Sequence, residues 1–215
     1  MLHHLLLLLS LQSGWIALFD GKDTSQWVGA KTGTFPPQGW VVENGMLVVN
    51  KDGSGRGGDL LSRRQFTNFD LEFEFRLTPG ANSGLKYLVK KYPDGSVLGC
   101  EYQIIDDQDN KDIAADKDDK RRTAGLYELF APTSRRLKPI GEWNQGRVRV
   151  NGPLIEHWLN GVKVVEVRRD GPDFQTAKAA SKFRNVADFG QGSGYLLLQD
   201  HGDPSAFRNI RIREL

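Results

Sequence analysis

The sequence predicts an all-β sandwich of two antiparallel sheets, and two features carry that prediction. Turn signals such as Asp20-Gly21 and Asn44-Gly45 recur at roughly the 8 to 12-residue spacing that is typical of sandwiches. In the segment 141–166, three short runs are separated by turns at Gly152-Pro153 and Asn160-Gly161, which is the pattern of a β-meander. No periodic stretch predicts a helix longer than about three turns.

The bulk composition fits one folded domain, which we expect over residues 14–215. The 29 Lys and Arg residues balance 27 Asp and Glu residues and are scattered, so nucleic acid is not an expected partner. The single cysteine, Cys100, cannot form an internal disulfide.

Residues 1–13 contain an apolar run that is too short to span a bilayer and is similar to the middle of a secretory signal peptide. His3 and His4 stand where Lys or Arg is usual, so a truncated start is the alternative. The interpretation as a signal-peptide remnant predicts a secreted or periplasmic protein without a membrane span.

Phe69 to Leu77 is the clearest predicted strand, because apolar and polar residues alternate without a break. Its carboxylates are expected on a solvated face rather than in acid/base work. One or two helical turns are expected at residues 175–180. The other predicted strands, besides those of the meander, are Trp40 to Glu43, Met46 to Asn50, Leu85 to Val89, Val97 to Ile105, Gly125 to Phe130, Gly194 to Gln199 and Phe207 to Arg213.

Several polar residues occupy alternating positions on runs that are otherwise suited to burial. Glu101 and Gln103 share one face of their predicted strand, and Lys86 lies between apolar neighbours. His157 lies on the middle run of the meander, where both faces are partly apolar. Buried polar groups need a partner or a ligand, so we expect these residues and His201 to meet at one cleft, with Lys86 in it or beside it.

Residues 106–122 are mostly charged and show no apolar period, which predicts a surface loop. An EF-hand is excluded because the loop lacks the central Gly and the closing Glu, although calcium in another geometry stays open. A long excursion of this kind often forms the rim of a site.

Many short motifs follow one another along the chain and cover nearly all of it after Trp15. They are LFDGKDTSQW, WVVENGMLVV, GGDLLS, FDLEFEFRL, NSGLKY, EYQIID, GLYELFAP, GEWN, IEHWLNG and LQDHGDPSAFRNIRIREL. In this order and number they resemble one bacterial family, the 3-keto-disaccharide hydrolase domain, formerly a domain of unknown function.

The resemblance implies a concanavalin A-like jelly roll with a concave face, and cleavage of glycosides that are oxidised to a ketone at C3. Laminarinase-type hydrolases of this fold use a Glu-x-Asp-x-x-Glu strand. Here EYQIID places Gln103 at the central carboxylate and has no second Glu, which disfavours a mechanism with two carboxylates.

A C3 ketone acidifies the C2 proton, so elimination at C1 followed by addition of water gives net hydrolysis. This chemistry needs a base, a group that stabilises the enolate and an acid. His157 and His201 are the candidate bases, with His157 preferred. Lys86 or Arg208 would stabilise the enolate, and Glu101 would protonate the leaving oxygen.

Other residues are expected to contact the sugar, through stacking in the case of the aromatic ones. A divalent metal and a non-catalytic, lectin-like binding module both stay open as alternatives. The expected sugar contacts are Gln103, Gln199, Asn82, Tyr127, Trp143, Trp158, Glu142 and Asp106.

Overall fold

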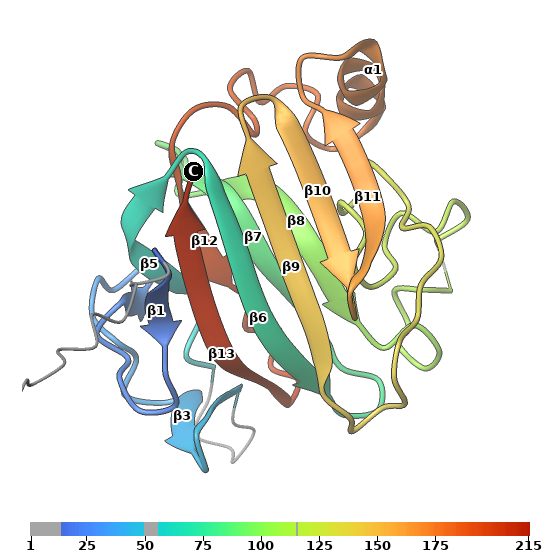
Figure 1. Ribbon diagram of the computed structural model, residues 1–215. Helices are drawn as coiled ribbons and strands as arrows, with labels where there is room; N and C mark the ends of the chain where they lie inside the picture. Colours follow the sequence, from blue (N-terminus) through green and yellow to red (C-terminus); the bar gives the residue numbers. More distant parts are fainter. Residues whose placement is uncertain (1–13, 50–55, 115) are drawn as a thin grey trace, which may run out of the picture.

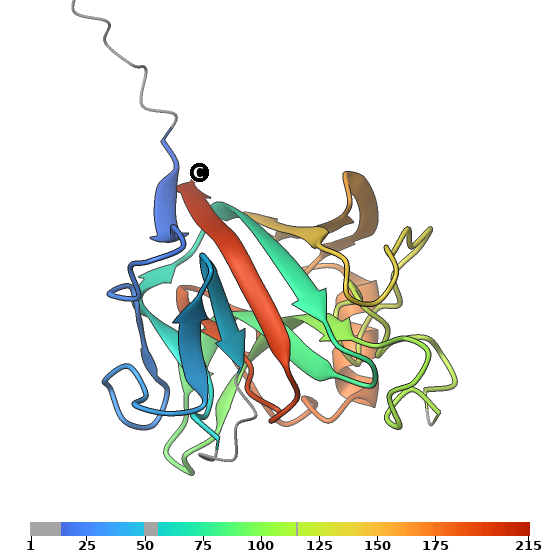
Figure 2. The same ribbon diagram turned by 90° about the horizontal axis from the view of Figure 1, so that it is seen from below.

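The computed structural model describes residues 14–49, 56–114 and 116–215, and it shows two antiparallel sheets packed face to face (Figure 1). The predicted sandwich is therefore confirmed. The two layers separate clearly in the view from below (Figure 2). The predicted signal-peptide remnant, residues 1–13, lies outside the described residues, and no helix of the described residues is long and apolar enough to cross a membrane.

The larger sheet has eight strands in the order β11-β10-β9-β6-β13-β4-β3, with β1 paired to β13. Its centre joins distant parts of the chain, since β6 lies between the meander and the C-terminal strand. The strands are β1 (Ile16–Phe19), β3 (Trp40–Glu43), β4 (Met46–Val49), β6 (Phe69–Leu77), β9 (Asn144–Asn151), β10 (Leu154–Leu159), β11 (Val162–Arg168) and β13 (Ser205–Glu214).

The smaller sheet has five strands in the order β2-β5-β12-β7-β8, so that β8 is an edge strand. It lies behind the larger sheet in Figure 1. Its strands are β2 (Trp27–Gly29), β5 (Leu60–Phe66), β7 (Asn82–Lys91), β8 (Val97–Ile105) and β12 (Gly194–Leu198). The one helix of the described residues, α1 (Pro172–Ala180), follows β11 and has nine residues, within the expected limit of three turns.

Alternation along the strands builds the core between the sheets. The odd-numbered residues of β6 are buried, and the ring of Phe73 meets Tyr102 of the opposite sheet edge-to-face at 5.2 Å. Aromatic pairs in this geometry stabilise a core beyond the area they bury. The meander and the Phe69–Leu77 strand are confirmed with nearly their predicted boundaries.

The predicted strand Gly125 to Phe130 is wrong. Only isolated bridges join Leu126 to Tyr102 and to Phe130, because Ala124 and Glu128 adopt positive φ angles of 70° and 67° that break an extended strand. The segment instead lies irregularly along β8.

Ion pairs cover the outer face of the larger sheet, where the β6 carboxylates point. Glu72 and Glu74 contact Arg211 and Arg208, as expected for a solvated face. Asp70 departs from that expectation, because it is fully buried beneath Arg147 and Arg213. Burial alone would raise the pKa of Asp70, but the bonds from Arg147 and Arg213 lower it.

Gly146 of β9 tests how tightly the core is packed. A Cβ atom at this position would lie 2.4 Å from Cζ of Phe73, so Gly146→Ala should destabilise the protein by about 1–3 kcal/mol in urea unfolding. Phe73→Leu should make the alanine less costly, giving a coupling between the two changes. Additive losses in the double variant would contradict this contact.

Candidate active site

The outer face of the smaller sheet brings together several of the predicted site residues. Lys86 of β7 is the direct cross-strand partner of Glu101 on β8, and Gly84 is the partner of Gln103. Their neighbours Leu85, Tyr102 and Ile104 point into the core, so alternation turns these polar side chains outward. The structure therefore brings Lys86 and Glu101 together, with Gln103 on the same face of β8.

The Glu101 carboxylate is the centre of the cluster. Nζ of Lys86 lies 3.8 Å from Oε2 of Glu101, and Nε2 of Gln199 donates to the same oxygen at 3.4 Å. Oε1 of Gln199 is buried and has no hydrogen-bond partner among the described residues. A buried acceptor without a partner is suited to a ligand hydroxyl group.

The environment of Glu101 changes its acidity. Burial raises the pKa of Glu101 to about 7, against the attraction of Lys86 and Lys182 and with the repulsion of Asp59 and Glu128. A carboxyl group with this pKa exchanges a proton near neutral pH, as a general acid or base must.

Two further groups approach from irregular segments. Tyr127, one of the expected sugar contacts, lies beside Glu101 because its backbone N–H donates to the Glu101 carbonyl at 3.0 Å. Nζ of Lys182 lies 4.4 Å from the centre of the Tyr127 ring, and burial lowers the pKa of Lys182. Sequence reasoning missed Lys182, since no apolar period or turn signal marks its segment.

His201 and Asn82 lie at one end of this face, beside a pocket of about 400 Å³. The pocket also contains Arg56 and Asp203. Although His201 is exposed to solvent, desolvation by the groups around its ring lowers its pKa. Asn82 lies two residues before Gly84 on β7, so the pocket continues the polar face that begins at Lys86.

The prediction that His157 shares this cleft is wrong. The side chain is fully buried between the sheets, where Nε2 lies 2.7 Å from the Tyr87 hydroxyl and Nδ1 lies 3.0 Å from the Ala124 carbonyl oxygen. Both faces of its strand are partly apolar, so alternation alone could not show which face is inside. A base at this position has no contact with the outer face.

Three other predicted residues lie on the opposite side of the molecule. Arg208 donates to Glu74 at 2.6 Å and stacks on Trp143, and Trp158 lies under Arg147 and Lys163. Arg208 and Trp158 alternate with core residues of the larger sheet and therefore lie on its outer face, and Trp143, just before β9, packs against Arg208. The structure therefore does not bring them to Glu101.

Asp106 and Glu142 border a different pocket, of about 430 Å³, between the end of β8 and residues 137–144. The Asp106 carboxylate is buried and accepts from the N–H groups of Gly80 and Gln108. These hydrogen bonds of Asp106 stabilise the turn that follows the end of β8 at Ile105.

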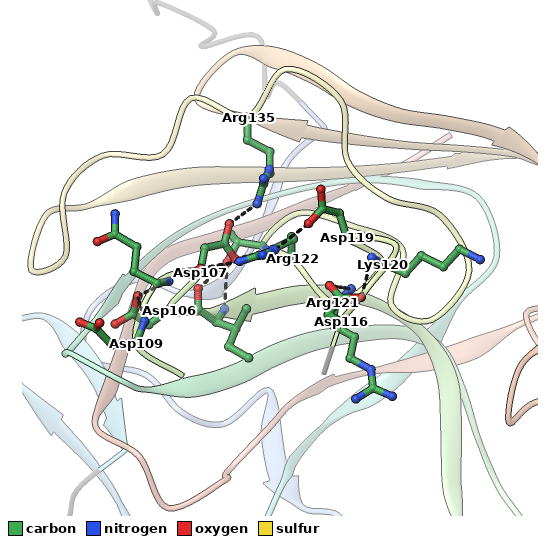
Figure 3. Close-up of polar contacts among 12 residues, drawn as sticks. Asp106, Asp107, Asp109, Asp116, Asp119, Lys120, Arg121, Arg122 and Arg135 are labelled. Carbon is green, nitrogen blue, oxygen red and sulfur yellow. Dashed lines mark hydrogen bonds and ion pairs between the residues drawn. The ribbon is translucent and has the colours of Figure 1, made fainter. Parts of the chain in front are cut away.

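The charged loop, residues 106–122, is held by ion pairs within the loop and with residues that follow it (Figure 3). Asp107 pairs with Arg135, Arg122 with Asp119, and Arg121 with Glu128. In the part of the chain that is described, no three His, Cys, Asp or Glu side chains are grouped to hold a metal ion. The loop supports the Tyr127–Glu128 segment at the edge of the site.

Comparison with known proteins places this chain in a family. The model of the 3-keto-alpha-glucoside-1,2-lyase-like domain matches residues 14–213. The chain belongs to this family. The lyase-like domain match includes Lys86, Glu101 and Gln199. A curated relative from Bacteroides thetaiotaomicron, named 3-keto-disaccharide hydrolase, is 32% identical over 94% of this chain and 79% of its own length.

Solved structures of other proteins are similar to the fold of this chain. A protein from Parabacteroides distasonis, described as a candidate glycosyl hydrolase, is 29% identical, covers 94% of both chains and has a TM-score of 0.82. A Bacillus subtilis protein with a galectin-like fold has a TM-score of 0.55 at 11% identity and covers 93% of this chain and 94% of its own. The second likeness concerns the fold alone.

Gly84 leaves room for the side chains of Gln199 and Glu101. A Cβ atom there would lie 2.1 Å from Oε1 of Gln199 and 2.9 Å from Oε1 of Glu101. Gly84→Ala should therefore displace both side chains and weaken sugar binding by about 10-fold or more in calorimetric titration, the effect of about 1.4 kcal/mol. Unchanged binding in a folded variant would show that the sugar does not contact this pair.

Glu101 and His157 should have opposite effects on stability between pH 4.5 and 6.5. Burial lowers the pKa of His157 to about 4, so its contribution to stability is complete above pH 6.5 and is lost as the pH falls. The raised pKa of Glu101, about 7, makes its contribution complete below pH 4.5 and lost as the pH rises through 7.

In the wild type the contributions of Glu101 and His157 to the free energy of unfolding should therefore nearly cancel over this pH range. The free energy of unfolding in urea should rise with pH in Glu101→Gln, by about 1 kcal/mol per pH unit above pH 4.5, while that of the wild type stays nearly constant. His157→Asn should show the opposite trend. Parallel curves for all three proteins would contradict both pKa shifts.

Proposed function

We propose that this protein cleaves 3-keto-glycosides by elimination, with Glu101 as the base that removes the C2 proton. The observation that carries the proposal is the buried Glu101 carboxyl group on the outer face of the smaller sheet, 3.8 Å from Nζ of Lys86 and 3.4 Å from Nε2 of Gln199. Burial raises the pKa of this group to about 7. The family to which the chain belongs and the relative named 3-keto-disaccharide hydrolase supply the substrate class.

The reaction balances with the groups present. The Glu101 carboxylate takes the C2 proton, and the electron pair enters the C3 carbonyl to give an enolate that the Lys86 ammonium stabilises. The pair then returns to form the C1=C2 bond as the C1–O bond breaks. Lys182 gives a proton to the leaving oxygen, which its lowered pKa favours. In the addition of water across C1=C2, Lys182 takes a proton from the water as its oxygen binds C1, and Glu101 returns its proton to C2. This restores both groups and completes net hydrolysis.

The unpaired acceptor of Gln199 would receive a sugar hydroxyl, and Tyr127 would supply an aromatic edge beside it. The pocket beside Asn82 and His201 would hold the leaving part of the substrate. Its polar lining suits a second sugar ring better than an apolar aglycone.

The competing function is a sugar-binding module without catalysis, because sandwiches of this kind also serve as lectins. A module needs hydrogen-bond donors and acceptors, but it does not need a carboxyl group that titrates near neutral pH. The burial of Glu101 between Lys86 and Lys182 therefore favours an enzyme.

Glu101→Gln should lower the rate of cleavage of a 3-keto-disaccharide by about 10²-fold or more, since the amide cannot accept the proton. Binding of the sugar should persist, because the two side chains have the same shape. Release of the product sugar, measured with and without deuterium at C2, checks the step. The matched control is Glu72→Gln on the opposite face, which should leave the rate unchanged.

The wild-type rate should rise with pH through about 7, as Glu101 loses its proton. The unoxidised disaccharide should be inert, since its C2 proton is not acidic. Cleavage of the unoxidised sugar with retention of C2 deuterium would overturn elimination. Sugar binding without cleavage of either substrate would favour the binding module.

A further inference from the structure

The segment from Ala124 to Glu128 takes the place of a neighbouring strand on the edge of β8. The Ala124 N–H donates to the Gln103 carbonyl at 2.8 Å, and the Tyr127 N–H donates to the Glu101 carbonyl at 3.0 Å. Both acceptors belong to residues of the candidate site. Positive φ angles at Ala124 and Glu128 are costly for non-glycine residues, so other contacts must hold the segment in place.

His157 makes such a contact from the opposite sheet. A carbonyl oxygen only accepts hydrogen bonds, so Nδ1 of His157 must carry the proton that binds Ala124 at 3.0 Å. In the neutral ring Nε2 then has no proton, and the Tyr87 hydroxyl must donate to it across 2.7 Å. The ring also packs against Tyr102, with centroids 5.0 Å apart, which fixes its orientation.

We propose that His157 is a positioning residue of the candidate site, which holds the Ala124 carbonyl and, through it, the segment that covers Glu101. The inference deepens the proposed function and rests on it for the effect on catalysis. The geometric part, in which the imidazole of one sheet fixes a segment at the edge of the other, rests on the hydrogen bonds alone.

The segment acts on Glu101 in two ways. The Glu128 carboxylate and the Tyr127 hydroxyl lie close enough to interact with the charge of Glu101, and the ammonium of Lys182 stacks on the Tyr127 ring. The charged groups that face Glu101 are Lys86, Lys182, Asp59 and Glu128, but burial is the largest cause of its raised pKa. If the segment loosens, water enters and the pKa of Glu101 should fall toward its ordinary value of 4.5.

Two substitutions separate the two hydrogen bonds of His157. The amide nitrogen of Asn reaches the position of Nδ1, so His157→Asn can keep the bond to Ala124 and lose the bond to Tyr87. The longer Gln reaches the position of Nε2, so His157→Gln can keep Tyr87 and lose Ala124. Tyr87→Phe removes the hydroxyl alone and is the matched control for a purely structural loss.

The measurement is the pKa of the Glu101 carboxyl group, followed by carbon NMR without substrate and assigned by comparison with Glu101→Gln. For each variant, the change in the Glu101 pKa is compared with the change in the free energy of unfolding in urea. His157→Gln should lower the Glu101 pKa by about one unit, while His157→Asn and Tyr87→Phe should leave it within about half a unit. Cleavage of the 3-keto-disaccharide should lose kcat in the Gln variant, with KM less affected.

Equal pKa shifts in the Asn and Gln variants would overturn the proposal and leave His157 as an ordinary core residue. If substitutions at His157 prevent folding, the test is the protonation state of the His157 ring in the wild-type protein. Its nitrogen chemical shifts should show a proton on Nδ1 only, and a proton on Nε2 would overturn the proposal. If the pKa pattern appears but no 3-keto-glycoside is cleaved, the proposed function fails while the positioning role stands.

Discussion

The structure depends on one constraint, the period-two alternation of side chains on two sheets that share a single apolar core. On β7 and β8, the burial of Tyr87 and Tyr102 between the sheets turns Lys86 and Glu101 outward. Pairing between the strands then places these two side chains directly opposite each other. The candidate site follows from the packing of the core, because a shift of one residue would place the charges between the sheets and the aromatic rings on the outer face.

The same alternation explains how much the sequence could predict. The strand Val97–Ile105 has polar residues on one face only, so the outward position of Glu101 could be predicted. β10 has apolar residues on both faces, so alternation could not show that His157 points inward, where Tyr87 satisfies it. Arg208 was misplaced for another reason, since alternation does not show to which of the two sheets a strand belongs.

Irregular segments account for what the sequence could not show. Lys182 lies in a stretch after α1 without any period, and Tyr127 lies where a regular strand was expected. Their positions depend on long-range hydrogen bonds and on positive φ angles such as that of Ala124. Such contacts have no local signal in the sequence, because the residues that determine them are distant along the chain.

The two outer faces of the sandwich shift the pKa of a buried carboxyl group in opposite directions. Asp70 receives two short bonds from the guanidinium of Arg147, and these outweigh the effect of burial and lower its pKa. Among the described residues, Glu101 is contacted by a lysine at 3.8 Å and an amide at 3.4 Å, and these do not offset burial, so its pKa rises to about 7. A fully paired carboxylate holds a sheet together, whereas an incompletely paired one can exchange a proton with a ligand. This difference, rather than the number of carboxylates, distinguishes the face with the candidate site from the face with the ion-pair network.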